Sequence, residues 1–167
     1  MKKVKCDLVL IGATGFTGKL VAEYLAQEYG VNNKNFVWAI AGRSQNKLNE
    51  LKNHLRGIDP EAKDLPVFLV NNHDRSSLDS ITSVTRVIIS TVGPYLKYGK
   101  KLVESCAFNG TDYCDLTGEV PFIRESIDSY NQIAQENNCR IIHSCGFDSI
   151  PSDIGVLMLQ TEAIKRY

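Results

Sequence analysis

Residues 8–18 read Leu-Val-Leu-Ile-Gly-Ala-Thr-Gly-Phe-Thr-Gly, an apolar run that passes into three regularly spaced glycines. The apolar run predicts a buried strand, and apolar side chains repeat behind it at helical spacing: Phe16, Leu20, Val21 and Tyr24. In such a unit the first glycine permits a tight turn, the second lets the backbone approach a pyrophosphate, and the third allows close helix–strand contact. The helix start offers free N–H groups to phosphate. The stretch predicts a dinucleotide-binding loop made of Gly12, Ala13, Thr14, Gly15, Phe16, Thr17 and Gly18. The alternative is a glycine-rich turn kept for packing.

Strand and helix patterns alternate along the rest of the chain. Further apolar runs lie at 36–41, 67–70, 87–90, 113–116 and 140–143, with helical patterns between them. Either Asp74 or Ser76 is placed to cap the third helix, and Pro121 stands at the entry of the fifth. Because parallel neighbours require right-handed crossovers, the alternation predicts an α/β fold with a doubly wound parallel sheet of about six strands.

Length and composition restrict the class of protein. We expect residues 1–167 to form one dinucleotide-binding domain, and expect it to be the N-terminal part of a longer two-domain protein, because a new helical pattern begins at Ile154. The 19 basic and 19 acidic residues leave no surplus positive charge for nucleic acid. The five cysteines show no C-x-x-C pair, and no signal peptide or membrane-spanning run is visible. These features favour the cytoplasm and a small-molecule substrate.

The end of the second strand bears on the choice of nucleotide. Enzymes that use NAD usually place Asp or Glu there to bind the ribose hydroxyls, whereas this chain has Gly42, Arg43 and Ser44. The guanidinium of Arg43 suits a 2′-phosphate and Ser44 adds a hydroxyl, which favours NADP(H) over NAD(H). The alternative is that Arg43 is an ordinary surface cation.

Two further loops follow strands at the same edge of the predicted sheet. Asn71 is placed to contact the adenine edge, although a solvated loop amide fits the sequence nearly as well. Thr91, Val92, Gly93 and Pro94 form a sharp turn after the fourth strand, and ligands of open α/β sheets bind outside such strand ends. We expect this turn to border the nicotinamide, with plain turn chemistry as the alternative.

The sequence does not single out a catalytic residue. No tyrosine is followed four residues later by lysine, so the short-chain dehydrogenase mechanism is disfavoured. No Ser-His-Asp or metal-ligand spacing is visible, and no metal site is expected. His143 ends the sixth strand, where a structural role is favoured over a place in the cofactor crevice.

Five motifs together resemble a known family. They are Ile11–Gly18, Ala41–Ser44, Ser90–Tyr95 with Tyr98–Gly99, Asp112–Glu119 and Ser144–Asp153. In this order they resemble the saccharopine dehydrogenase-like oxidoreductases, a family that includes trans-acting enoyl reductases. The resemblance covers roughly residues 7–160 and implies an NAD(P)-binding Rossmann domain. In the family a second part follows, which shapes the substrate site and the dimer, so the resemblance also implies a homodimer formed through that part.

The sequence therefore predicts the cofactor domain of an NAD(P)-dependent oxidoreductase, inactive on its own. The substrate is either an enoyl or lipid-like acyl chain or an amino-acid-derived compound. The only arginines near the expected site, Arg86 and Arg140, stand at the amino ends of their strands, which tilts the choice away from an amino acid. The alternative from another class is a non-catalytic NADP(H)-binding sensor or scaffold module.

Overall fold

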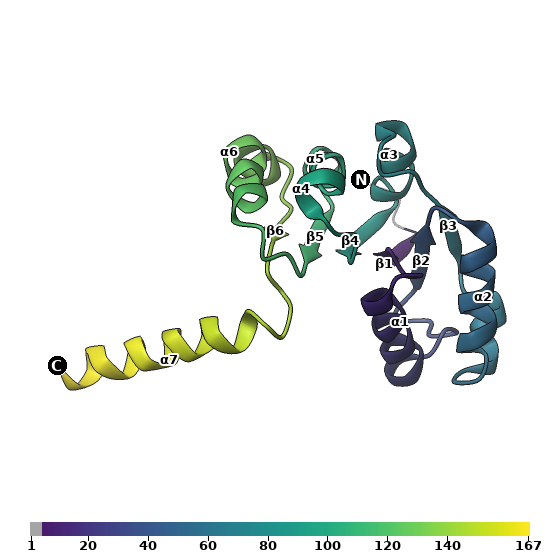
Figure 1. The fold of residues 1–167 in the computed structure, drawn as a ribbon, viewed down its shortest axis with the longest axis horizontal. Helices are drawn as coiled ribbons and strands as arrows, with labels where there is room; N and C mark the ends of the chain where they lie inside the picture. Colours follow the sequence, from purple (N-terminus) through teal and green to yellow (C-terminus); the bar gives the residue numbers. More distant parts are fainter. Residues whose placement is uncertain (1–4) are drawn as a thin grey trace.

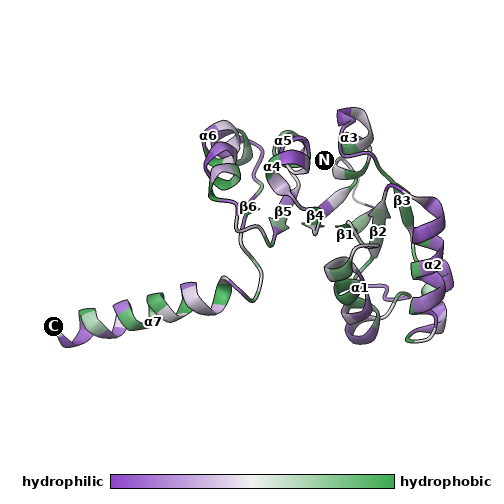
Figure 2. Ribbon diagram, in the orientation of Figure 1, coloured by the Kyte–Doolittle hydropathy of each residue, from purple (hydrophilic) through white to green (hydrophobic). Residues whose placement is uncertain are grey.

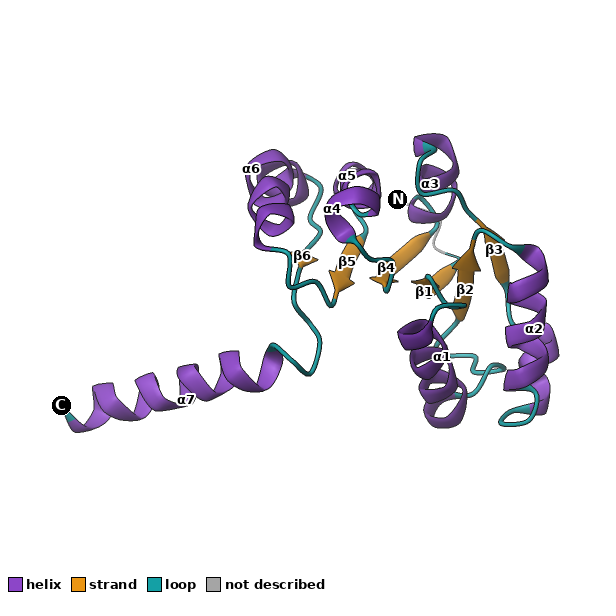
Figure 3. Ribbon diagram, viewed as in Figure 1, coloured by secondary structure: helices purple, strands orange, loops and turns teal. Residues whose placement is uncertain are grey.

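β1 (Cys6–Ile11) lies at the centre of a parallel sheet in the computed structural model, which describes residues 5–167. Within these residues the sheet has six strands in the order β3-β2-β1-β4-β5-β6 (Figures 1 and 3). The other strands are β2 (Trp38–Gly42), β3 (Val67–Leu69), β4 (Thr85–Ser90), β5 (Asp112–Asp115) and β6 (Ile141–Ile142). The predicted doubly wound fold is confirmed, and no strand end differs from the predicted one by more than two residues.

Helices cover both faces of the sheet. One face carries α1 (Phe16–Tyr29) and α2 (Gln45–Leu55), whereas α3 (Arg75–Thr82), α5 (Lys100–Asn109) and α6 (Val120–Glu136) lie on the other (Figure 1). The remaining helices are the 3-10 helix η1 (Pro60–Asp64), the short α4 (Tyr95–Tyr98) and the C-terminal α7 (Ile150–Arg166). Asp74 is the residue that caps α3, since its carboxylate accepts a hydrogen bond from the Ser76 amide at 3.0 Å.

The core is divided by the sheet into two layers. Leu10 and Ile40 pack toward α1 and α2, together with Trp38, whose Nε1 donates to the Gly30 carbonyl at 2.8 Å. Tyr113 and Phe122 are both 1% exposed in the layer toward α3, α5 and α6. Since strands buried on both faces need apolar side chains of both parities, this arrangement explains the continuous apolar runs in the sequence.

The buried face of α1 differs from the apolar repeat that predicts the helix. Small and aliphatic residues face the sheet: Gly18, Ala22, Leu25 and Ala26. The larger side chains of Phe16, Leu20 and Tyr24 are 84%, 52% and 57% exposed. The close approach of helix to strand at Gly18 selects small residues on the inner side, so the bulky residues of the repeat lie outside.

α7 extends away from the rest of the chain, and none of its residues is buried (Figure 1). Hydrophobic residues nevertheless occur on it from end to end (Figure 2). Across residues 5–167, no helix combines the length and the apolar character that crossing a bilayer requires.

Candidate functional site: a nucleotide cavity at the carboxyl edge of the sheet

A cavity of about 240 Å³ opens where the strand order reverses, between the carboxyl ends of β1 and β4. Ligands of open α/β sheets bind at such a reversal point. The lining residues come from the carboxyl ends of β1 and β2, from the loops that follow β1–β4, and from α4: Ile11, Gly12, Thr14, Gly15, Gly42, Arg43, Asn72, His73, Thr91, Val92, Gly93 and Tyr98. Seven of the residues predicted from sequence are among them: Gly12, Thr14, Gly15, Arg43, Thr91, Val92 and Gly93.

Each of the three loop positions requires glycine for a different structural reason. Gly12 has φ of +86°, and a Cβ there would lie 2.7 Å from the Val92 side chain. A Cβ on Gly18 would lie 2.2 Å from the Gly12 carbonyl oxygen, so this glycine sets the closeness of α1 to the loop. Gly15 is the exposed N-cap of α1 and lines the cavity. Both ends of the loop are therefore fixed by packing, and its middle faces the cavity.

The N-terminus of α1 is free to bind an anion. No side chain caps it, and its first turn contains no acidic residue. The first backbone N–H groups of a helix have no acceptor within the helix, and they carry the positive end of its dipole. Among the other predicted loop residues, Ala13 and Gly18 are buried, Thr17 is half-buried and Phe16 points to solvent.

Arg43 and Ser44 take different places at the end of β2. Arg43 is exposed and lines the cavity, whereas the Ser44 hydroxyl caps α2 by accepting from the Lys47 amide at 3.4 Å. Lys47 lines an adjoining hollow between α1 and α2, which shares Thr14 with the cavity. Lys47 is a basic residue near Arg43 that the sequence reasoning missed. The sequence could have indicated Lys47, because it lies four residues after Arg43, in the first turn of α2.

Asn72, rather than Asn71, lines the cavity beyond β3. Asn71 is exposed; its Oδ1 accepts from the His73 amide at 3.0 Å, and it lines a separate shallow hollow beside Arg43. Asn72 is only 7% exposed, and its Nδ2 has no hydrogen-bond partner in the protein. Because a buried amide without a partner is costly, Asn72 is suited to a ligand that supplies the partner.

The turn after β4 is joined to the glycine loop. The Thr91 hydroxyl donates to the carbonyl oxygens of Ile11 and Gly12, each at 3.2 Å. Val92 and Gly93 line the cavity, whereas Pro94 is the N-cap residue of α4 and does not line it. The two loops that border the cavity thus hold each other in place.

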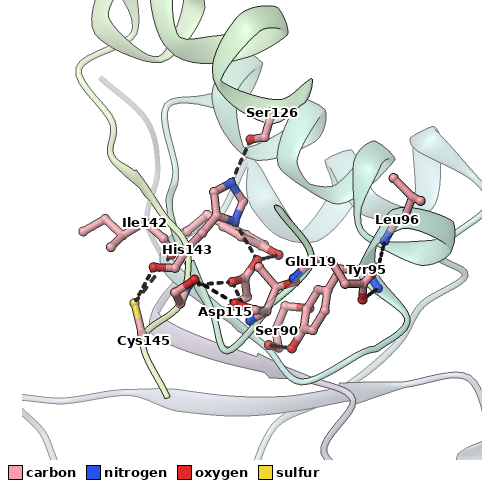
Figure 4. A network of polar contacts seen from close by, with 12 residues as sticks. Ser90, Tyr95, Leu96, Asp115, Glu119, Ser126, Ile142, His143 and Cys145 are labelled. Atoms are coloured by element: carbon pink, nitrogen blue, oxygen red, sulfur yellow. Dashed lines mark hydrogen bonds and ion pairs between the residues drawn. The ribbon is translucent and has the colours of Figure 1, made fainter. Parts of the chain in front are cut away.

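A second polar cluster lies at the carboxyl ends of β5 and β6 (Figure 4). Asp115 is buried, and its carboxylate accepts from the Tyr113 hydroxyl at 2.8 Å and from the amides of Thr117 and Ser144 at 3.1 and 3.2 Å. Its Oδ2 also lies 2.8 Å from Nδ1 of His143. Asp115 therefore organises both loops that follow these strands.

His143 connects Asp115 and Ser126 in a hydrogen-bonded Ser-His-Asp arrangement that the sequence spacing did not reveal. Its Nε2 lies 2.9 Å from the hydroxyl of Ser126 on α6 (Figure 4). The side chain of His143 is 7% exposed and Ser126 is 4% exposed. Both ring nitrogens of His143 have hydrogen-bond partners, so this arrangement holds α6 against the strand ends. Because Ser126 is buried, it is not an accessible nucleophile.

Glu119 anchors the same region to the turn after β4. Its two carboxylate oxygens accept from the amides of Tyr95 and Leu96 at 2.6 and 2.9 Å, at the start of α4 (Figure 4). The Tyr95 hydroxyl donates to the Ser90 carbonyl at 3.0 Å, and burial raises the pKa of Tyr95 to about 12. These contacts connect the two polar regions of the edge.

Comparison with known proteins shows the family to which this chain belongs. Residues 8–142 match the family described as the saccharopine dehydrogenase NADP binding domain. The chain belongs to this family. It is 44% identical over 159 residues to a protein named trans-acting enoyl reductase from Mycobacterium tuberculosis strain H37Rv, and 43% identical over 163 residues to one from Mycobacterium leprae. These alignments cover 95% and 98% of the chain but 36% and 37% of the relatives, so it spans about a third of their length.

The family's fold is also seen in solved structures. Apo saccharopine dehydrogenase (L-Glu forming) from Saccharomyces cerevisiae superposes with a TM-score of 0.65 at 20% identity, over 86% of this chain and 28% of that one. Apo AtPrR2 gives a TM-score of 0.53 at 15% identity, over 83% and 48%. At these identities the likeness concerns the fold alone.

Two thiols lie near the polar cluster, on β5 and after β6, and neither has the properties of a reactive cysteine. Burial, with added repulsion from nearby acidic groups, raises the pKa of Cys114 to about 12. Burial and the charge of Asp115 also raise the pKa of Cys145, which is exposed. Both thiols therefore stay protonated at neutral pH.

Proposed function

We propose that this chain is the NADP(H)-binding domain of an oxidoreductase. The observation that carries the proposal is the uncapped N-terminus of α1, which faces a cavity bordered by Arg43 and Asn72. Support comes from the family match, whose description names NADP. When bound, the nicotinamide supplies hydride transfer, and the protein supplies binding and orientation.

In this proposal different residues of the cavity bind different parts of the nucleotide. The amides after Gly15 hold the pyrophosphate, since they are the free donors of α1. Arg43 binds the 2′-phosphate, with Lys47 as a second cation and Ser44 fixing the start of α2. Asn72 takes the adenine contact that the sequence suggested for Asn71, because Asn72 lines the cavity and lacks a partner. Thr91, Val92 and Gly93 border the nicotinamide ribose.

An enoyl or other lipid-like acyl chain is the substrate class that we favour. The relatives at 44% identity are named enoyl reductases. Arg86 and Arg140 stand at the amino ends of their strands and pair with Asp7 and Asp112, so neither is placed to bind the carboxylate of an amino acid. We further propose that the domain works in the cytoplasm as part of a longer two-domain enzyme, as its 36% coverage of the relatives suggests.

A non-catalytic sensor is the second candidate. It is favoured by the complete hydrogen bonding of His143 and Asp115, which leaves no free acid or base in that cluster. A sensor would bind NADPH without oxidising it when enoyl thioesters are offered. An enzyme in its full-length form would oxidise NADPH in proportion to the acceptor.

Calorimetric titration with NADPH and NADH tests the cofactor assignment. We expect NADPH to bind more tightly, and Arg43→Ala to remove that preference while leaving NADH binding unchanged. Arg56→Ala, a change of another exposed arginine that does not line the cavity, is the matched control. If neither nucleotide binds to a folded sample, the proposed function is wrong for this chain.

A further inference from the structure

The short helix α4 begins with two backbone donors that the helix itself cannot satisfy. The amides of Lys97 and Tyr98 both donate to the Pro94 carbonyl, at 3.2 and 3.0 Å. The amides of Tyr95 and Leu96 come first in the helix, where no earlier turn offers them an acceptor. Pro94, the N-cap residue, has no side-chain oxygen to cap them. The start of α4 therefore depends on another part of the chain for two hydrogen bonds.

Glu119 supplies both acceptors from 24 positions further along the chain. One carboxylate oxygen accepts from the Tyr95 amide at 2.6 Å and the other from the Leu96 amide at 2.9 Å (Figure 4). Glu119 is also the N-cap residue of α6, and its own amide donates to the hydroxyl of the buried Thr117 at 3.1 Å. Because hydrogen bonds to an ionised carboxylate are stronger than neutral ones, Glu119 ties the start of α4 firmly to α6.

These two bonds fix one end of the turn 91–94, which borders the cavity. The Tyr95 amide follows Gly93 and Pro94 directly in the chain, and Gly93 lines the cavity. The other end of the turn is fixed by Thr91, whose amide donates to the Ile11 carbonyl at 3.0 Å. The turn is thus held by the glycine loop on one side and by Glu119 on the other. Glu119 does not line the cavity itself, so it acts on a bound cofactor through the turn.

We propose that Glu119 is a positioning residue for the nicotinamide half of the cofactor. It fixes the turn that borders the nicotinamide ribose under the proposed function, on which this inference rests. The adenine half binds at Arg43 and Asn72 in that function, whereas the side-chain hydrogen bonds of Glu119 go to the start of α4. Loss of the carboxylate should therefore loosen the nicotinamide and leave the binding of the adenosine part unchanged.

Two ligands separate the halves of the cofactor in calorimetric titrations of the 167-residue chain. Adenosine 2′,5′-bisphosphate carries the adenine and the 2′-phosphate without the nicotinamide, whereas NADPH carries all three. Glu119→Gln keeps one acceptor oxygen but turns an NH₂ donor toward the second amide, so it breaks one bond and keeps the size of the side chain. We expect NADPH affinity to fall about fivefold, as for one lost hydrogen bond, and the affinity for adenosine 2′,5′-bisphosphate to stay unchanged.

Glu125→Gln is the matched control. Glu125 also joins α6 to the segment after the turn, through an ion pair of 2.7 Å with Nζ of Lys100 at the start of α5. Both of its side chains are exposed to solvent, and such pairs contribute little. The same chemical change at this position should leave both affinities at their wild-type values.

The fluorescence anisotropy of the reduced nicotinamide, measured on NADPH at saturating protein, reports how firmly the ring is held. It should be lower in Glu119→Gln than in the wild type and in Glu125→Gln. Circular dichroism checks that each variant is folded. If Glu119→Gln does not fold, Glu119→Asp takes its place, because it keeps the charge and is one methylene too short for both amides. The same selective loss of NADPH binding is expected from it.

The outcomes separate this inference from the proposed function. If Glu119→Gln weakens the binding of both ligands equally, Glu119 supports the whole site, and the positioning role is wrong although the proposed function stands. The positioning role is also wrong if the variant keeps the wild-type NADPH affinity and anisotropy. A folded wild type that binds neither ligand overturns the proposed function, and this inference with it.

Discussion

Nδ1 of His143 lies 2.8 Å from Oδ2 of Asp115, in a pair whose side chains are 7% and 0% exposed. The two residues are 28 positions apart, and each ends or follows a neighbouring strand. Through them the loops after β5 and β6, and α6 through Ser126, become one rigid unit beside the nucleotide cavity.

Removal of the buried carboxylate should destabilise the domain strongly. We expect Asp115→Ala to lower the free energy of unfolding by about 3–5 kcal/mol, because it leaves several buried donors without an acceptor. Urea unfolding measures the loss. Asp112→Ala, which removes a pair with the exposed Arg140, should cost much less. Equal losses for the two variants would show that Asp115 does not organise the loops.

Two glycine substitutions should behave oppositely. Gly18→Ala forces a Cβ to within 2.2 Å of the Gly12 carbonyl oxygen, so we expect a lower melting temperature and weaker NADPH binding. Gly118→Ala meets nothing within 4 Å and should leave the melting temperature unchanged or raise it slightly. Thermal unfolding with and without NADPH checks both variants. A Gly18→Ala protein of wild-type stability and affinity would contradict the packing reason given for this glycine.

Asn72 should affect binding without supporting the fold. Asn72→Leu removes a buried amide nitrogen that has no partner, so the free energy of unfolding should stay level or rise by up to about 1 kcal/mol. NADPH affinity should nevertheless fall about fivefold, since the adenine loses a hydrogen bond worth about 1 kcal/mol.

Asn71→Leu is the matched control for this prediction. It removes only the acceptor of the His73 amide at the surface, so nucleotide affinity should stay close to wild type. The reverse pattern, with Asn71→Leu weakening binding and Asn72→Leu neutral, would return the adenine contact to Asn71.

Alkaline pH should destabilise the domain through Tyr95. Its folded-state pKa of about 12 lies above the ordinary value of 10, so ionisation is easier in the unfolded chain. The stability that its neutral form contributes is complete below pH 10 and is lost as pH rises toward 12. Urea unfolding at pH 8, 10 and 11.5 should show a decline that is smaller for Tyr95→Phe, after allowing for its lost hydrogen bond to Ser90. Parallel declines in the two proteins would exclude Tyr95 as the cause.

The sequence by itself determined the local elements of this protein. Strands, helices and the glycine loop depend on side-chain periodicity and on backbone freedom over a few residues, so Gly12–Gly18 and the position of Arg43 could be predicted. Only the tertiary structure decided which neighbour of a pair faces inward, as with Asn71 and Asn72, and which side of α1 is buried. It alone brought Ser126, His143 and Asp115 together. The physical reason is that these features depend on contacts between residues far apart in the chain, which periodicity within a segment does not encode.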